Sequence, residues 1–203
     1  RIFDRDGRLK DGAKESDVSE YIEIQRTYVE SVRLARDVLQ SEGVSDSARN
    51  VNLLREANTA LESLNILKNS LESSESKLPT EELTRLNSGL EASIAEMSNT
   101  LSNAIRSTYR SYSLETNPTS KKAIKAELDK IAKASDKFDV LKEEIDLNAR
   151  DTKFEIQKLE NRLKELEGNP DVVTYGEKTQ VAKELLIARD RLLRLQLDSL
   201  DVG

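Results

Sequence analysis

The stretch that decides the fold is residues 120–167, SKKAIKAELDKIAKASDKFDVLKEEIDLNARDTKFEIQKLENRLKELE, which contains neither glycine nor proline. Its apolar residues recur every three or four positions, a spacing that places them on one face of an α-helix. The pattern predicts one continuous helix of about 48 residues, roughly 70 Å long. A compact domain of this chain length has a radius of gyration of only about 17 Å. An unbroken helix here therefore predicts an elongated molecule.

Polar residues interrupt the apolar face of this helix at Ser135, Asn148 and Thr152, and Asn87 does the same in an earlier helix. A buried Asn between helices costs stability but fixes their register. The alternative is that the helix simply faces solvent at these points. A break near Ser135 or within 148–152 would replace the elongated form by a compact bundle of five or six helices.

The remainder of the chain shows the same helical periodicity between short turns. Seven glycines and three prolines leave few breakers, so the helices must be long. Thr174 followed three residues later by Glu177 matches a capping box at the start of the last helix. The predicted helices cover 17–42, 46–76, 81–112, 120–167 and 175–199.

These elements predict an all-α protein, an elongated antiparallel bundle or coiled coil of about five long helices. Residues 1–16 form either a polar leader or a small β-hairpin with Asp6-Gly7 in its turn. Residues 17–135 form a bundle, and 136–203 form a helical hairpin that projects from it as a stalk. A single long bundle with staggered ends is the alternative to the stalk.

Composition excludes several kinds of chemistry. The chain has no Cys and no His, so thiol nucleophiles, disulfides, the usual zinc sites and a Ser-His-Asp triad are impossible. It has no glycine-rich phosphate loop, and its adjacent acidic pairs, such as Glu143-Glu144, point to different sides of a helix. We therefore expect no enzyme activity, no cofactor, no bound metal and no small-molecule substrate.

The balance of charge bears on the class of partner. The net charge is −6 with a pI near 5.1, which favours solubility and argues against nucleic acid and against an anionic membrane surface. No apolar run approaches the roughly 20 residues that a membrane-spanning helix needs. The chain begins at Arg1 rather than Met, so the lack of a signal-peptide pattern leaves the compartment unknown.

One group of basic residues lies on both sides of the turn near Pro118. The positive charges of this basic tip accompany Tyr109 and Tyr112 and suggest a site for phosphate or an acidic partner. The alternative is ordinary surface charge at the end of a bundle. The basic tip comprises Arg106, Arg110, Lys121, Lys122 and Lys125.

The last predicted helix carries a second apolar flank in addition to its main stripe. A helix that is apolar on two sides contacts two neighbours, so this flank is a candidate docking face for a partner. Its residues are Leu186, Ile187, Leu193 and Leu197.

Three classes of function follow from this pattern. The first is a non-enzymatic structural or interaction module, a helical spacer or scaffold that docks a protein partner or assembles with copies of itself. The second is a helical section of a secreted or cell-surface assembly such as a toxin, a secretion apparatus or a phage-like fibre. The third is a membrane-surface helical module, which the interleaved charges disfavour.

Overall fold

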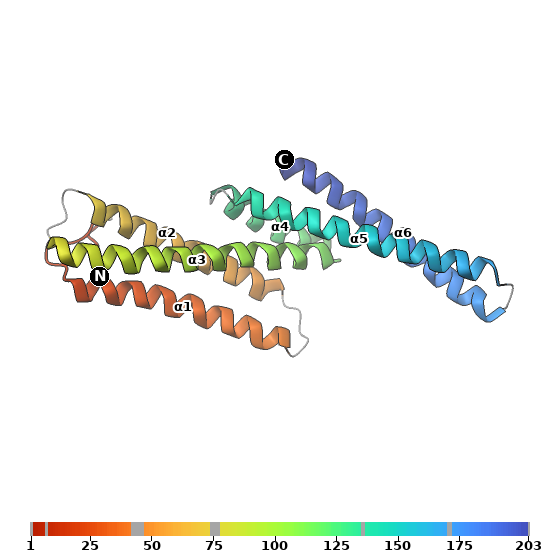
Figure 1. Ribbon diagram of the computed structural model, residues 1–203, viewed down its shortest axis with the longest axis horizontal. Coiled ribbons are helices and arrows are strands. Elements are labelled where there is room, and N and C mark those ends of the chain that lie inside the picture. Colours follow the sequence, from red (N-terminus) through yellow and green to blue (C-terminus); the bar gives the residue numbers. More distant parts are fainter. Residues whose placement is uncertain are drawn as a thin grey trace. The chain divides into compact units, whose positions relative to one another are not determined.

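The computed structural model describes residues 2–6, 8–41, 47–73, 78–134, 137–169 and 172–202. Within these residues the chain forms six α-helices and no strand (Figure 1), which confirms the all-α prediction. The helices are α1 (Glu15–Ser41), α2 (Ser47–Glu72), α3 (Thr80–Leu114), α4 (Pro118–Ala134), α5 (Phe138–Glu167) and α6 (Val172–Val202).

The expected continuous helix over 120–167 is wrong, because α4 ends at Ala134 and α5 begins at Phe138. The amide of Lys137 donates to the carbonyl of Ala132 at 2.9 Å, a hydrogen bond of the kind that closes helix C-termini. The Lys137 side chain donates from Nζ to Ser98 Oγ of α3 at 2.9 Å. No single helix spans residues 120–167, so helix length gives no reason to expect an elongated molecule.

The contacts of the chain divide it into two compact units, residues 1–137 and 138–203. The first unit holds α1 to α4, and the second holds α5 and α6. The predicted boundary between bundle and hairpin lay at 135/136, close to this division.

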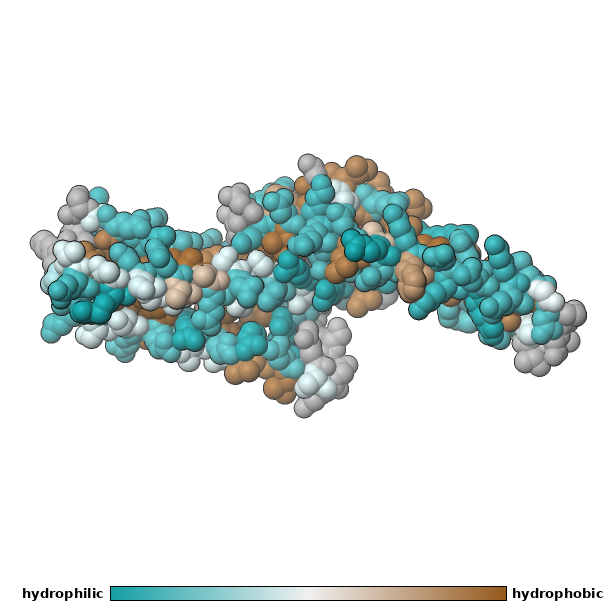
Figure 2. Space-filling model, viewed as in Figure 1, coloured by the Kyte–Doolittle hydropathy of each residue, from teal (hydrophilic) through white to brown (hydrophobic). Residues whose placement is uncertain are grey.

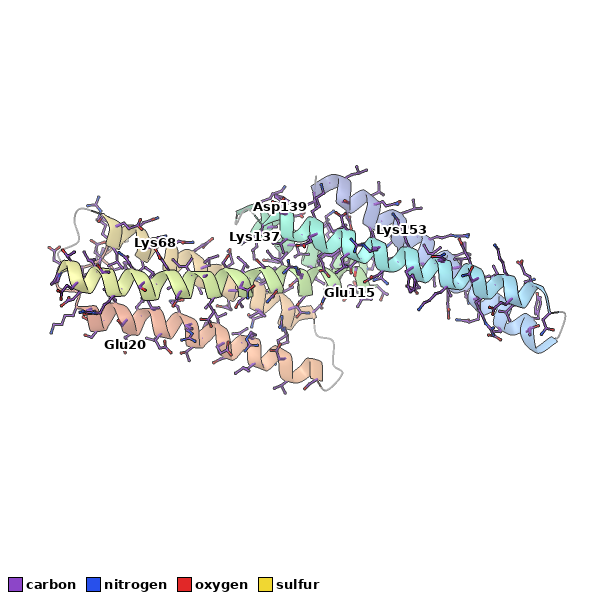
Figure 3. All side chains as sticks on the ribbon, viewed as in Figure 1. Glu20, Lys68, Glu115, Lys137, Asp139 and Lys153 are labelled. Atoms are coloured by element: carbon purple, nitrogen blue, oxygen red, sulfur yellow. The ribbon has the colours of Figure 1, made fainter. Side chains whose placement is uncertain are left out.

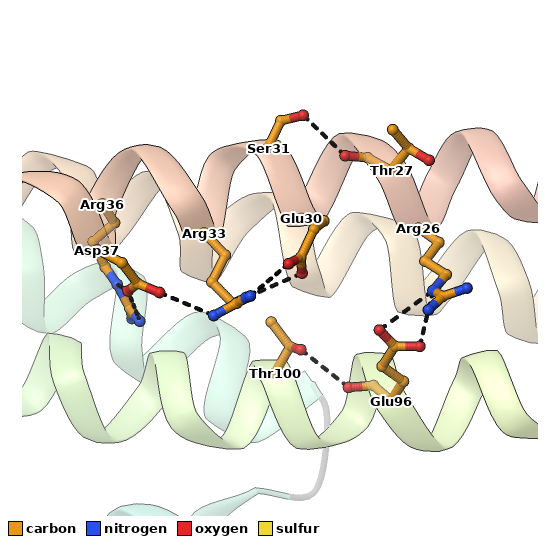
Figure 4. Close-up of polar contacts among 9 residues, drawn as sticks. All are labelled: Arg26, Thr27, Glu30, Ser31, Arg33, Arg36, Asp37, Glu96 and Thr100. Atoms are coloured by element: carbon orange, nitrogen blue, oxygen red, sulfur yellow. Dashed lines mark hydrogen bonds and ion pairs between the residues drawn. The ribbon is translucent and has the colours of Figure 1, made fainter.

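In the first unit, α1 runs parallel to α3 with a constant register. Glu15 accepts from Arg85 Nε at 2.9 Å, and Arg26 Nε lies 3.1 Å from Glu96 Oε2. Figure 4 shows the second of these pairs beside the Glu30–Arg33–Asp37 group, which lies along α1 itself. Further along, Arg36 Nη1 donates to Ser107 Oγ at 3.4 Å. The α3 partners recur at intervals of 11 residues, which is about three helical turns, so they lie on one face of α3.

Helix α4 packs on the opposite side of α3. Its Lys121 Nζ lies 4.7 Å from the centre of the Tyr112 ring, and beyond its other end Lys137 reaches Ser98. Ser98 is two residues from Glu96, which is about 200° around the helix. Helix α3 is thus the central element of this unit, and α1 and α4 lie on different faces of it. The largest fully buried side chains of this unit are Val18, Leu53, Leu54, Leu64, Leu67, Leu90, Met97, Leu101 and Ile105.

A buried polar cluster joins the start of α2 to the end of α3. Asn50 Nδ2 donates to Ser111 Oγ at 2.6 Å, and Thr108 Oγ1 donates to the Asn50 carbonyl at 3.2 Å. All three residues are buried. Such a cluster favours one register of the two helices, because any slip would leave buried polar groups unsatisfied.

Replacing Ser111 by alanine is expected to lower the free energy of unfolding by about 1–3 kcal/mol, because it removes the acceptor of a buried amide. Urea denaturation followed by circular dichroism measures this. Ser113→Ala is the matched control, since Ser113 is not buried and its hydroxyl donates only to the nearby Arg110 carbonyl. Equal effects of the two substitutions would contradict the role given to the cluster.

An ion pair links α2 to α4 and makes stability depend on pH. Arg55 Nη2 lies 2.8 Å from Glu127 Oε1, and this hydrogen bond holds the pKa of Glu127 below its ordinary value. A lowered carboxyl pKa stabilises the fold above the ordinary pKa, and the effect is lost as the pH falls through the lowered value. Because Arg55 is more than half exposed, solvent screening limits the effect to about 1 kcal/mol or less.

Glu127→Gln is therefore expected to lose slightly less stability than the parent chain between pH 6 and pH 3. Parallel urea titrations at these two pH values measure the difference. A variant that loses more stability than the parent on acidification would show the opposite sign and contradict this assignment.

The second unit is an antiparallel helical hairpin of α5 and α6. Ser199 Oγ donates to Asp146 Oδ1 at 3.0 Å, and Arg189 Nη2 lies 3.0 Å from Glu160 Oε1. Near the turn, Arg162 contacts Glu177. The buried apolar residues are Leu141, Ile145, Leu166, Val181, Leu185, Ala188 and Leu195.

The polar positions expected along the seam of α5 are buried rather than solvent-facing. Asn148 is 9% exposed and Thr152 is 2% exposed, and the Thr152 hydroxyl donates to the Asn148 carbonyl at 2.8 Å. Asn87 of α3 is half-buried, and Ser135 lies outside the described residues. The capping box at Thr174 is wrong: Thr174 lies inside α6 and donates to the Asn169 carbonyl.

The N-terminal residues fold back on themselves before α1. Phe3 and Leu9 form an isolated antiparallel bridge, and Lys10 N donates to the Ile2 carbonyl at 2.8 Å. The Phe3 ring meets Tyr21 of α1 edge-on at 5.3 Å between centroids. This aromatic contact attaches the N-terminal segment to the first helix.

Candidate protein-docking surfaces

Helix α6 has two apolar faces, and only one of them forms the hairpin core. Four leucines with spacings of seven, four and three residues lie on the side away from Val181, Leu185 and Leu195. Their exposed fractions run from 61 to 76%, which is high for leucine. We call these four residues the α6 stripe: Leu186, Leu193, Leu197 and Leu200.

The sequence placed Leu186, Ile187, Leu193 and Leu197 on this docking face, and all four are exposed. Ile187 lies about 100° from Leu186 around the helix and so borders the stripe. Leu200 was missed because the last helix was expected to end at Ser199. Helix α6 in fact continues to Val202, which adds one more turn to the exposed face.

Charged residues border the stripe on the Ile187 side. Arg194 Nη2 lies 3.1 Å from Asp190 Oδ2, and both side chains are about three-fifths exposed. Lys183 and Asp201 are also exposed. The spacings from Lys183 to Asp190, Arg194 and Asp201 put all four on one flank of α6. The opposite flank carries Lys178, Arg189 and Gln196.

A second exposed apolar stripe runs along α1 of the first unit. More than half of each of its side chains is exposed. In Figure 2 apolar side chains reach the surface over the C-terminal parts of α1 and α6. The α1 stripe consists of Ile24, Tyr28, Leu34 and Val38.

The predicted basic tip lies on both sides of the turn from α3 to α4, with two of its residues on α3 and three on α4. Lys121 stacks its ammonium on the Tyr112 ring, whose centre lies 5.6 Å from that of Tyr109. Glu115 also lies in this turn (Figure 3) and accepts from the Asn117 amide at 2.9 Å. A carboxylate in this turn weakens the attraction of nearby basic residues for an anion. Binding of an acidic partner at the basic tip, formed by Arg106, Arg110, Lys121, Lys122 and Lys125, stays a prediction.

Three further features concern the described part of the chain. Among these residues no cluster of three or more acidic, His or Cys side chains is suited to hold a metal ion. None of the described helices combines the length and the hydropathy that crossing a membrane requires. A shallow groove between α5 and α6 includes Asp146, Leu195, Ser199 and Leu200.

Comparison with protein-family models, with curated proteins and with solved structures finds no match for this chain. The functional interpretation therefore depends on the surfaces that the fold exposes.

Proposed function

We propose that this chain is a non-enzymatic structural and interaction module, a helical scaffold that docks a protein partner or assembles with copies of itself. The observation that carries the proposal is the α6 stripe, four leucines on one helix face that are each at least 61% exposed. Single exposed apolar residues are normal on protein surfaces, whereas a contiguous apolar strip marks an interaction site.

The energetics support a docking role. Burying a leucine side chain contributes about 1.5–3 kcal/mol. The leucines of the α6 stripe are each at least 61% exposed, so they gain only a minor part of this within the hairpin. The hairpin core uses the other side of α6, at Val181, Leu185, Ala188 and Leu195. Covering the α6 stripe with another protein surface would recover this burial.

The surroundings of the stripe also suit a protein interface. Protein interfaces combine an apolar centre with a polar, solvent-accessible rim. Lys183, Asp190, Arg194 and Asp201 border the leucines on one flank and would provide such a rim. Charges of both signs on this rim favour a protein partner over a polyanion.

Site-specific photo-crosslinking in the cells that make the protein tests the proposal. A photoreactive phenylalanine derivative in place of Leu193 is expected to give a discrete adduct, because the stripe is covered by a partner. Gln157, an exposed polar residue of α5, is the matched control position and should give none.

The mass of the adduct separates the two forms of the proposal. An adduct of twice the chain mass of 22.9 kDa indicates self-assembly, and any other discrete mass indicates a different protein partner. The same adduct pattern at Leu193 and Gln157, or no adduct at either, would refute a docking role for the α6 stripe.

A further inference from the structure

We propose that the occupant of the α6 stripe is the α6 stripe of a second copy of this chain, in an antiparallel arrangement about a two-fold axis at Leu193. This inference rests on the proposed function and names its partner. It follows from the symmetry of the leucine pattern, from the charges on one flank of α6 and from the dimensions of the helix.

Three of the four leucines are placed symmetrically about Leu193, whereas Leu197 lies level with Arg189 of the second copy. Leu186 lies seven residues before it and Leu200 seven residues after it. In an antiparallel pair with its axis at Leu193, Leu186 of one copy therefore faces Leu200 of the other, and Leu193 faces itself. A surface that matches itself in this way is what a two-fold dimer interface requires.

The charged flank is also self-complementary in this arrangement. A two-fold axis perpendicular to the helices brings each flank against the same flank of the second copy. Asp190 of one copy then lies level with position 196 of the second copy. Arg194 of the second copy is two residues from that level, which is about 3 Å along the helix axis. Lys183 likewise lies about 3 Å along the axis from Asp201 of the second copy. Symmetry doubles both pairs. It also brings the two copies of Arg194 about 3 Å apart along the axis, with one Asp190 on the outer side of each.

A parallel pair has less of this complementarity. There the flank with Lys183 and Arg194 meets the other flank of the second copy, which carries Lys178, Arg189 and Gln196. Arg189 is already paired with Glu160 of α5. Asp190 lies level with Arg189 of the second copy there, but Lys183 and Asp201 meet no opposite charge, so the parallel arrangement has fewer complementary pairs than the antiparallel one.

The size of the surface sets the expected strength. Helix α6 has 31 residues and is about 46 Å long, and a helix is about 10 Å wide. Each copy would thus contribute roughly 460 Å², and the pair roughly 900 Å². This is below the about 1,200 Å² of stable standard interfaces. We therefore expect a weak dimer whose population rises with protein concentration.

Engineered cysteines test the arrangement cleanly, because the chain has no cysteine of its own. The full-length Leu193→Cys variant is expected to form an intermolecular disulfide under mild oxidation, since the two Cβ atoms face each other at the axis. Leu186→Cys alone should not cross-link, because its two copies are about 21 Å apart along the helix axis. An equimolar mixture of Leu186→Cys and Leu200→Cys should cross-link into a heterodimer.

Leu34→Cys, at an exposed leucine of the α1 stripe, is the control for random collision. Charge reversal provides a second readout by sedimentation: Asp190→Arg should weaken the dimer at least several-fold, and adding Arg194→Asp should restore it. Each of these variants changes only exposed side chains.

Three results would overturn the inference. Self-cross-linking of Leu186→Cys as efficient as that of Leu193→Cys indicates a parallel pair. Equal cross-linking of Leu34→Cys indicates collision. A monomeric parent chain with no cross-link in any variant excludes self-pairing. In that last case, an adduct of another mass from the photoreactive group at Leu193 would still uphold the proposed docking function.

Discussion

Replacing Leu101 by alanine is expected to lower the free energy of unfolding of the first unit by about 2–5 kcal/mol. Leu101 is fully buried in α3, the central helix of that unit, and the substitution removes three carbons from a filled core. Urea denaturation followed by circular dichroism, with amide hydrogen exchange to assign the loss to α1–α4, measures the change.

The matched control for this substitution is Leu34→Ala on α1 in the same unit. Leu34 is 51% exposed, so its truncation is expected to change the free energy of unfolding by about 0.5 kcal/mol or less. If Leu101→Ala were as mild as Leu34→Ala, α3 would not be the centre of the core.

The second large effect is expected from Leu185→Ala in the hairpin. Leu185 is 4% exposed and lies on the face of α6 that forms the hairpin core. A loss of about 2–5 kcal/mol removes most of the stability available to a unit with a single thin core between two helices. Amide hydrogen exchange should show α5 and α6 losing protection while α2 and α3 keep theirs.

The neighbouring residue supplies the control. Leu186→Ala changes the same residue type one position away, but Leu186 is 66% exposed. Measured at low protein concentration, it should leave the protection of α5 and α6 unchanged. Equal destabilisation by both substitutions would contradict the assignment of two distinct faces to α6.

Local sequence pattern was enough to predict most of the helices. The three-to-four spacing of leucines in α2 and of Leu90, Met97 and Leu101 in α3 identifies buried faces, and these residues are buried. The presence of a helix can be predicted mainly from such periodicity, which is a local property of the sequence. The all-α class follows directly from it.

No glycine or proline marks the break between α4 and α5, and in the sequence only the polar Ser135 interrupts the apolar face close to it. Residues 120–167 contain neither glycine nor proline. The contacts around Lys137 are partly tertiary, since its side chain bonds to Ser98, 39 residues away in the chain. Tertiary contacts of this kind override helix propensity and leave no periodic signal.

The exposed apolar face of α6 was predicted from the sequence, whereas that of α1 was not. The sequence identified Leu186, Leu193 and Leu197 as a second apolar flank, because α6 already had a complete core stripe. Tyr28 and Leu34 of α1 show the same apolar periodicity, but both are more than half exposed. Apolar periodicity shows that a face seeks burial, but it does not show what covers that face.

Hydroxyl-radical footprinting of the full chain at low and high protein concentration tests most directly the claim that the α6 stripe is the surface of association. We predict that Leu193 is oxidised at low concentration and protected at high concentration. Leu34 should be oxidised equally at both concentrations, and the buried Leu195 should be protected at both. Oxidation of Leu193 that does not change with concentration, or protection that appears at Leu34 instead, would contradict the account.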